Sequence, residues 1–290
     1  MKLIKNEKTA EIVGLCFGDG SLIRRKSGKN KDKLRFQMRG HIIEDKEHYD
    51  TYVKPLFDKI IGDVSIATYE GKKPYYGIAS ENQKICNYLK FLGVPVNTKE
   101  ELQIPNWIIS NKEYLKCFLR GFIDTDGSVF CGKDYNYPKK KHIKIRMSIA
   151  SISHNFIKEV SGSLVQLRIH NLIIKPYKQK NSKWGNLNKI QIDGPNVRDY
   201  FKIIGSHNPK HITKFKVWRK FGFCPPYTTL EQRKNILDGK LNPNSFYASD
   251  NPPSKKAGMS ELGQKSTVED GKQKPYALVA ARVRIPFPAL

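Results

Sequence analysis

Two helix-like segments of this chain share one pattern and end in the same way. The first runs from Ile12 to Ser21 and the second from Leu119 to Ser128, and they align without a gap at an offset of 107 residues. Small residues stand four apart in each segment, at Gly14 and Gly18 in the first and at Gly121 and Thr125 in the second. Residues four apart share one helix face, and small side chains let two backbones approach closely. We therefore expect these two helices to pack against each other.

The residues after each helix repeat as well. Residues 33–39 and 142–148 alternate between apolar and polar side chains, the pattern of a strand with one buried and one exposed face. The side chains expected on the exposed faces are Lys33, Arg35, Gln37 and Arg39 in the first strand, and His142, Lys144, Arg146 and Ser148 in the second. Both exposed faces are thus basic or polar.

The rest of each half continues the repetition. We expect helices at 45–61 and 154–167, strand pairs at 64–69 with 75–80 and at 172–178 with 189–193, and closing helices at 82–92 and 196–204. Each half therefore has the order αββαββα, which predicts an α+β fold of two units related by a pseudo-twofold axis. We place the units at residues 1–104 and 105–247. A Gly-, Ser- and Lys-rich tail at 248–290 has the composition of a linker or a disordered segment.

The helix ends carry two carboxylates, Asp19 and Asp126. Packing the helices side by side brings these groups together at the negative ends of the helix dipoles, where each carboxylate is disfavoured and where the two repel each other. Hard divalent cations bind carboxylate oxygens and would relieve both effects. A single Asp-Gly dipeptide is more often an ordinary turn. Two in register, each ahead of a basic-faced strand, favour a shared metal site.

The net charge of the chain indicates the class of its binding partner. The chain has 52 Lys and Arg residues against 27 acidic residues, a net charge of +25. Such an excess attracts polyanions, and nucleic acid is the first of these to consider, ahead of acidic membranes. No apolar run is long enough for a membrane helix, and the N-terminus lacks a secretory segment. Five dispersed cysteines without a CxxC pair indicate a reduced, intracellular setting.

At these residues the sequence resembles the LAGLIDADG family of homing endonucleases and RNA maturases. The first copy, Ile12 to Gly20, departs from the family motif at Phe17, whereas the second, Leu119 to Gly127, keeps both acids, Asp124 and Asp126. The resemblance implies two four-stranded antiparallel sheets that form a saddle over the DNA major groove. It also implies that the eighth motif position, here Asp19 and Asp126, holds the metal. Gly18 and Thr125 join them as candidate ligands.

Many members of the family have a lysine beside each active site. Each half of this chain closes with an Asn-x-Lys sequence, which makes Lys99 and Lys210 the candidates. Three histidines near helix ends, His41, His207 and His211, are interpreted as surface residues.

The expected function is a monomeric, Mg²⁺-dependent endonuclease, with Mn²⁺ able to substitute, that cleaves double-stranded DNA at a long asymmetric site during intron homing. The strand residues named above would contact that DNA, Arg reading guanine and Gln reading adenine. The alternative is a group I intron maturase that binds intron RNA on the same scaffold, alone or as a second activity. A non-cutting DNA-binding regulator is a further alternative. Both are less favoured because the two acids are present.

Overall fold

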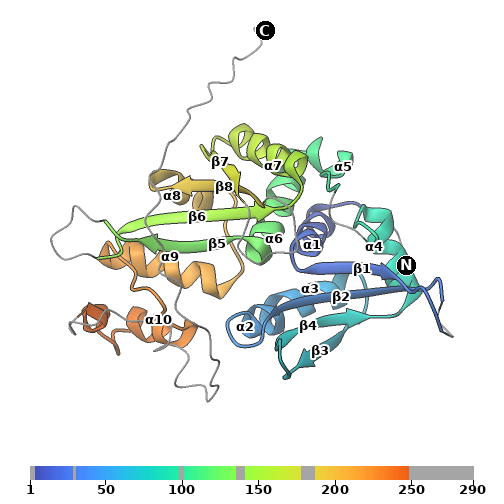
Figure 1. Cartoon of the computed structure of the whole chain (residues 1–290), viewed down its shortest axis with the longest axis horizontal. Coiled ribbons are helices and arrows are strands. Elements are labelled where there is room, and N and C mark those ends of the chain that lie inside the picture. The colour runs from blue at the N-terminus through green and yellow to red at the C-terminus, as the bar shows by residue number, and fades with distance from the viewer. Residues whose placement is uncertain (1–3, 29–30, 98–100, 135–140, 178–186, 248–290) are drawn as a thin grey trace, which may run out of the picture.

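The computed structural model describes residues 4–28, 31–97, 101–134, 141–177 and 187–247, and its elements form two halves of the same order (Figure 1). The first half contains α1 (Glu7–Gly18), β1 (Gly20–Arg24), β2 (Leu34–His41), α2 (Lys46–His48), the π-helix η1 (Tyr49–Val53), α3 (Lys54–Ile60), β3 (Ser65–Tyr69), β4 (Tyr75–Ser80) and α4 (Gln83–Leu92). The second contains α5 (Asn106–Ile109), α6 (Lys112–Asp126), β5 (Ser128–Gly132), β6 (Lys144–Ser151), α7 (His154–Gln166), β7 (Leu172–Tyr177), β8 (Leu187–Asp193) and α8 (Pro195–Ile203).

Each half forms one four-stranded antiparallel sheet. The strand orders are β1-β2-β4-β3 and β5-β6-β8-β7, so the two sheets have the same topology. In Figure 1 the sheets lie on opposite sides of the central helices α1 and α6. The predicted α+β fold of two αββαββα units is therefore confirmed. The unit boundary after residue 104 stays a prediction, and the tail at 248–290 lies outside the described residues.

The two central helices pack backbone to backbone. A Cβ atom added to Gly14 would stand 2.1 Å from the carbonyl oxygen of Phe118, and one added to Gly121 would stand 2.3 Å from that of Glu11. Nearer the C-terminal ends, a Cβ on Gly18 would stand 1.9 Å from Oγ1 of Thr125. Since real Cβ atoms do not come this close to other heavy atoms, these positions require the absence of a side chain.

The glycine after each of these helices has a steric role. Neither Gly20 nor Gly127 has a positive φ angle, so neither is a left-handed helix cap. A Cβ on Gly20 would lie 2.6 Å from the carbonyl oxygen of Cys16, and one on Gly127 would lie 2.3 Å from that of Ile123. Each strand thus leaves its helix by passing directly over the last helical turn, which fixes the direction of the acid just before it.

A buried ionic cluster joins the two halves beside these helices. Glu11 of α1 is fully buried, and its carboxylate is 2.7 Å from Arg120 Nη2 of α6 and 2.9 Å from Nδ1 of His207. The hydroxyl of Tyr52 also donates to it at 2.7 Å. Burial by itself raises the pKa of Glu11, but the hydrogen bonds from His207 and Arg120 outweigh it and lower the pKa to about 2. The charged form of Glu11 therefore holds the halves in register.

Two further helices follow the second unit, α9 (Pro209–Phe221) and α10 (Leu230–Leu237), with a short 3-10 turn η2 (Pro243–Tyr247). They lie below the second sheet in Figure 1, and α10 reaches the first half. Arg233 of α10 is fully buried and pairs with Glu44 at 2.9 Å, while Lys234 pairs with Glu47 at 2.5 Å. This C-terminal extension therefore ties the second half to the start of α2.

No helix in the described part of the chain is both long and apolar enough to cross a lipid bilayer.

Candidate functional site

Asp19 and Asp126 lie at the ends of the paired helices. Asp19 caps α1 and Asp126 is the last residue of α6. The two carboxylates interact: burial, followed by the negative charge of Asp126 and then by that of Asp45, raises the pKa of Asp19 to about 7. Asp126 is exposed to solvent. The site thus holds a protected carboxylate next to an open one, and their repulsion is the type of strain that a bound cation relieves.

Tyr49 holds the protected carboxylate. Its hydroxyl donates a hydrogen bond to Oδ2 of Asp19 at 3.0 Å, and its ring is fully buried. Tyr49 is the first residue of η1, a π-helical turn between α2 and α3. Such turns are rare and occur often at functional sites. Nothing in the sequence pattern indicates this contact, because Tyr49 fits an ordinary apolar position of the expected helix.

Lys210, in the second half of the chain, lies near Asp45 and Asp19 of the first half. Its Nζ atom is 2.6 Å from Oδ1 of Asp45, and Oδ2 of Asp45 accepts the amide of His41 at 2.8 Å. Burial by itself raises the pKa of Asp45, but the charge and hydrogen bond of Lys210 outweigh it and lower the pKa. The positive charge of Lys210 also acts on Asp19, whose pKa it lowers. One of the two predicted lysines is therefore near the acids, and the other, Lys99, lies outside the described residues.

Asn208 directs Lys210 toward the first half. Its side-chain oxygen caps α9 by accepting the amide of Lys210 at 2.9 Å, and its amide group donates to the backbone oxygen of Asp124 at 2.7 Å. The carboxylate of Asp124 in turn accepts the amide of His207 at 2.7 Å. The end of α6 thereby anchors the start of α9, which explains why the second Asn-x-Lys sequence is held against the acids.

The donor set fits a hard divalent cation. Within the described ranges, no group of three or more His, Cys, Asp or Glu side chains is arranged to hold a metal. Two carboxylates suffice for Mg²⁺, which usually takes one or two from a protein and keeps water or phosphate oxygens as its other ligands. Gly18 and Thr125 line the helix contact beside the acids, and the Thr125 hydroxyl is 3.1 Å from the Gly121 carbonyl. Their part in metal binding stays a prediction.

Four of the predicted strand side chains have the exposure expected of a contact surface. Arg35 and Arg39 are exposed on β2, and Lys144 and the half-buried Arg146 occupy β6. Three of them pair with acidic side chains: Arg35 is 3.7 Å from Glu81, Lys144 is 3.3 Å from Asp134, and Arg146 is 3.0 Å from Asp193. Arg39 instead donates to Oε1 of the buried Gln37 at 2.6 Å. Exposed ion pairs are worth little in water, so these cations can exchange partners for phosphate.

Other predicted strand residues differ from expectation. The strand expected from His142 begins at Lys144, and His142 is 9% exposed, with Nδ1 3.1 Å from the Tyr247 hydroxyl. The expected exposure of His142 is therefore wrong: η2 covers it. Gln37 is also buried, 5% exposed, because it donates to the hydroxyl of Tyr75 at 3.0 Å and accepts from Arg39. Ser148 is half-buried, whereas Lys33, immediately before β2, is exposed as expected.

Comparisons with known proteins agree with the resemblance seen in the sequence. Residues 113–205, which include the second acid motif, match the family model of a LAGLIDADG-like domain. An uncharacterised protein of Methanocaldococcus jannaschii is 26% identical over 191 residues, which are 63% of this chain and 62% of that protein. The chain thus matches less than two thirds of the length of this relative.

Three solved structures are similar at low identity. The homing endonuclease I-DmoI in complex with DNA and Mn is 17% identical, with a TM-score of 0.45 over 69% of this chain and 96% of that one. The meganuclease I-SmaMI bound to uncleavable DNA is 15% identical, with a TM-score of 0.48 over 81% and 98% of the two chains. The N-terminal LAGLIDADG domain of WhiA is 16% identical, with a TM-score of 0.42 over 69% and 81%.

Proposed function

Because this chain carries a LAGLIDADG-like domain, we propose that it is an endonuclease that cleaves double-stranded DNA with a divalent metal. The observation that supports this most is that Asp19 and Asp126, at the ends of the paired helices, lie near enough for the negative charge of Asp126 to raise the pKa of Asp19. Two neighbouring carboxylates at helix ends repel each other unless a cation is shared between them, and the pKa of Asp19 is raised first by burial and then by the negative charge of Asp126. A purely structural helix pair would have no reason to keep both acids.

Each group has a defined part in the proposed reaction. Asp19 and Asp126 would hold Mg²⁺ or Mn²⁺, and the bound metal would supply Lewis-acid activation of a water and of a phosphodiester oxygen. Lys210, held by Asp45, places a positive charge next to Asp19 and offsets part of the negative charge at the site. The close backbone contact between α1 and α6 would hold the ends of the two helices, and with them the two acids, at a fixed separation.

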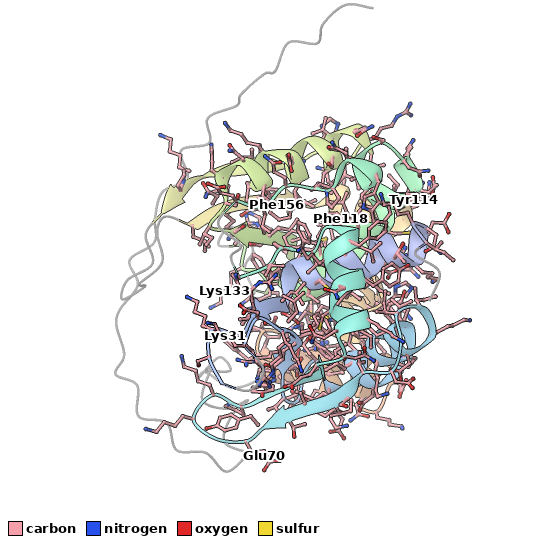
Figure 2. The ribbon with its side chains drawn as sticks, turned by 90° about the vertical axis from the view of Figure 1, so that its right-hand side faces the viewer. Lys31, Glu70, Tyr114, Phe118, Lys133 and Phe156 are labelled. Carbon is pink, nitrogen blue, oxygen red and sulfur yellow. The ribbon has the colours of Figure 1, made fainter. Side chains whose placement is uncertain are left out.

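The proposed DNA surface combines the two sheets. β2 and β6, the strands with the basic side chains, each pair with the strand that directly follows an acid-bearing helix. Figure 2 shows Lys31, before β2, and Lys133, after β5, on the same side of the molecule. Together with the net charge of +25, this supports a basic surface that neutralises phosphates on either side of the acids. Because the two halves differ in sequence, the site on the DNA need not be palindromic, and one chain can act as a monomer.

A cleavage selection tests the proposal without knowledge of the target. The full chain is incubated with a library of randomised DNA duplexes in Mg²⁺, in Mn²⁺ or in EDTA, and the new ends are sequenced. The proposal predicts ends that share one long asymmetric motif and that need the metal. No enrichment in either metal, with the protein folded and bound to DNA, would rule out the nuclease. Stabilisation of a folded group I intron RNA by such a non-cutting protein would then favour the maturase.

A further inference from the structure

A buried tyrosine holds one of the two acids, Asp19. The carboxylate of Asp19 accepts a hydrogen bond from the fully buried Tyr49 hydroxyl at 3.0 Å. At the same offset of 107 residues, the second half has Phe156, which has no hydroxyl. The ring of Phe156 packs 5.0 Å from that of Phe122 and 5.6 Å from that of Phe17, within the apolar core. The tyrosine contact thus belongs to one half of a pseudo-symmetric site.

The fold makes room for this tyrosine in particular. A Cβ atom added to Gly40 of β2 would stand 2.6 Å from Cε2 of Tyr49 and 2.9 Å from Cβ of Asp45, so the ring occupies the space that a side chain at residue 40 would fill. The amide of Tyr49 donates to the Asp45 carbonyl at 3.0 Å. Its ring also meets that of Tyr76 edge-on, with the centroids 6.4 Å apart. The ring is therefore held from the strand, from the start of α2 and from β4.

A held hydroxyl restricts what the carboxylate can do. An ionised carboxylate only accepts hydrogen bonds, and the tyrosine hydroxyl, whose ordinary pKa is near 10, is a donor at neutral pH. With Oδ2 engaged by Tyr49, Oδ1 of Asp19 is the oxygen left for another partner. Hydrogen bonds to charged groups are among the strongest in proteins, so the contact resists rotation of the carboxylate. Asp126, at the open edge of the site, is exposed.

We propose that Tyr49 is a positioning residue that fixes the Asp19 carboxylate for metal binding, through a tyrosine contact that Phe156 does not repeat in the second half, so that the two acids contribute unequally and the two DNA strands are cut at different rates. The inferred difference in cleavage rate between the two DNA strands rests on the proposed nuclease function. Its metal-binding part stands on the contact between Tyr49 and Asp19 and can be tested without any DNA.

The test compares Tyr49→Phe with Tyr76→Phe in the full chain. Tyr76 is a matched control because it is a neighbouring buried tyrosine whose hydroxyl donates to Asp50 and not to Asp19. Free Mn²⁺ is followed by electron paramagnetic resonance during titration of the metal into each protein. Tyr49→Phe is expected to weaken Mn²⁺ binding about tenfold, as the loss of an outer-shell partner typically does, and Tyr76→Phe to leave it within twofold. Equal Mn²⁺ affinity of the wild type and Tyr49→Phe would overturn the proposal.

A second measurement separates the strands. With a duplex from the cleavage selection, labelled on one strand at a time, Tyr49→Phe is expected to slow the nicking of one strand about tenfold and that of the other less than twofold. Equal slowing of both strands would contradict the unequal roles. A wild type that binds Mn²⁺ but cuts no DNA would refute the nuclease and leave the Mn²⁺ comparison of the variants valid.

A variant that restores the hydrogen-bond donor distinguishes the loss of that donor from misfolding of the protein. Substituting 4-aminophenylalanine at residue 49 returns an N–H donor to the same ring position. It is expected to recover most of the Mn²⁺ affinity that Tyr49→Phe loses. If the amino variant is folded and binds Mn²⁺ no better than Tyr49→Phe, then the donor is not what positions Asp19, and the proposal fails.

Discussion

Gly14 of α1 lies against Phe118 of α6 so closely that a Cβ atom on Gly14 would stand 2.1 Å from the Phe118 carbonyl oxygen. Gly121 makes the reciprocal approach to the Glu11 carbonyl oxygen, at 2.3 Å from its own added Cβ. These obstacles are backbone atoms, which cannot rotate away as a side-chain end could. The positions of Asp19 and Asp126 therefore depend on two glycines one to two helical turns away.

The first prediction concerns these glycines. Gly14→Ala is expected to lower the free energy of unfolding by about 2–4 kcal/mol, because the helices must separate to admit the methyl group. The control is Gly162→Ala in α7, where an added Cβ meets nothing within 4 Å. That change is expected to be neutral or to stabilise by about 0.5–1 kcal/mol, since alanine is the better helix former. Denaturant unfolding measures both variants, and equal stabilities would contradict the close helix contact.

The second prediction is a pH dependence of stability in the metal-free protein. The folded state holds the pKa of Asp19 at about 7, above the value near 4 of an unfolded chain. Between these values the folded protein binds the extra proton, so this group favours folding at low pH, and the benefit is lost as the pH rises through 7. Asp19→Asn removes the charge. In EDTA it should raise Tm by about 3–6 °C at pH 8 and hardly change it at pH 4.

Divalent metal provides the matching control for that prediction. Binding to the folded state stabilises it by mass action, so Mn²⁺ should raise the Tm of the wild type at pH 8 and that of Asp19→Asn much less. A wild type more stable than Asp19→Asn at pH 8 in EDTA would mean that the carboxylate charge is already well compensated within the protein, against the assignment of a metal site.

The third prediction separates cutting from binding. Asp19→Asn and Asp126→Asn should each reduce double-strand cleavage at least about 100-fold, because each removes a ligand charge from the proposed metal site. Both should bind the selected duplex as well as the wild type or more tightly, since each removes a negative charge that faces the phosphates. Gel-shift titration in Ca²⁺ and cleavage in Mg²⁺ measure the two effects. A fully active Asp126→Asn enzyme would remove that residue from the mechanism.

The fourth prediction concerns Lys210. Its positive charge lowers the pKa of Asp19, so Lys210→Met should raise that pKa further and shift the acid limb of the cleavage pH profile to higher pH. Cleavage at pH 7 should fall about tenfold or more. Lys216→Met is the matched control, because Lys216 is exposed on the same helix α9. If the two variants have the same pH profile, then Lys210 has no influence on the reacting acids.

Much of the fold could be predicted because it follows from local periodicity. The strands at Tyr75–Ser80 and the helices at Gln83–Leu92 and His154–Gln166 lie within a residue or two of the expected ranges. The pairing of the halves followed from the repeated motif. The capping of α6 was harder to place: Ser110 and Glu113 suggest a capping box, but Asn111 is the cap and accepts the amides of Glu113 and Tyr114.

The strand faces were harder to match between the halves. Gln37 pairs across the sheet with Ser21, and Ser148 pairs with Ser128. Gln37 and Ser148 are therefore equivalent, whereas the alternating patterns at 33–39 and 142–148 align Ser148 with Arg39 and predict a second strand that begins at His142. The connections before β2 and β6 differ in length, and nothing in a single sequence shows how many residues each of them takes up.

The departure at Phe17 illustrates a limit of motif reading. Phe17 and Asp124 stand at the same position of the two helices, yet Phe17 packs 5.2 Å from the ring of Phe118, whereas Asp124 accepts the amide of His207. The acid anchors the residues that lead into α9, the helix that carries Lys210, and the phenylalanine cannot form such an anchor. The motif showed that the residue differs but gave no indication of which loop depends on it.

The remaining features of the site could not be predicted because they are contacts between residues far apart in the sequence. Tyr49 with Asp19, and Lys210 with Asp45, join segments that only the folded chain brings together. With 52 basic residues, no single lysine stands out by type. His41 is exposed as expected, but two of the three histidines differ from the expectation: His211 is 1% exposed, and His207 pairs with the buried Glu11.

The most direct test of the shared metal site is anomalous diffraction from crystals of the protein with its selected DNA and Mn²⁺. The account predicts an anomalous peak at the ends of α1 and α6, within about 2.5 Å of a carboxylate oxygen of Asp19, of Asp126, or of both. Mn²⁺ bound elsewhere, with both carboxylates free of metal beside the DNA, would contradict it.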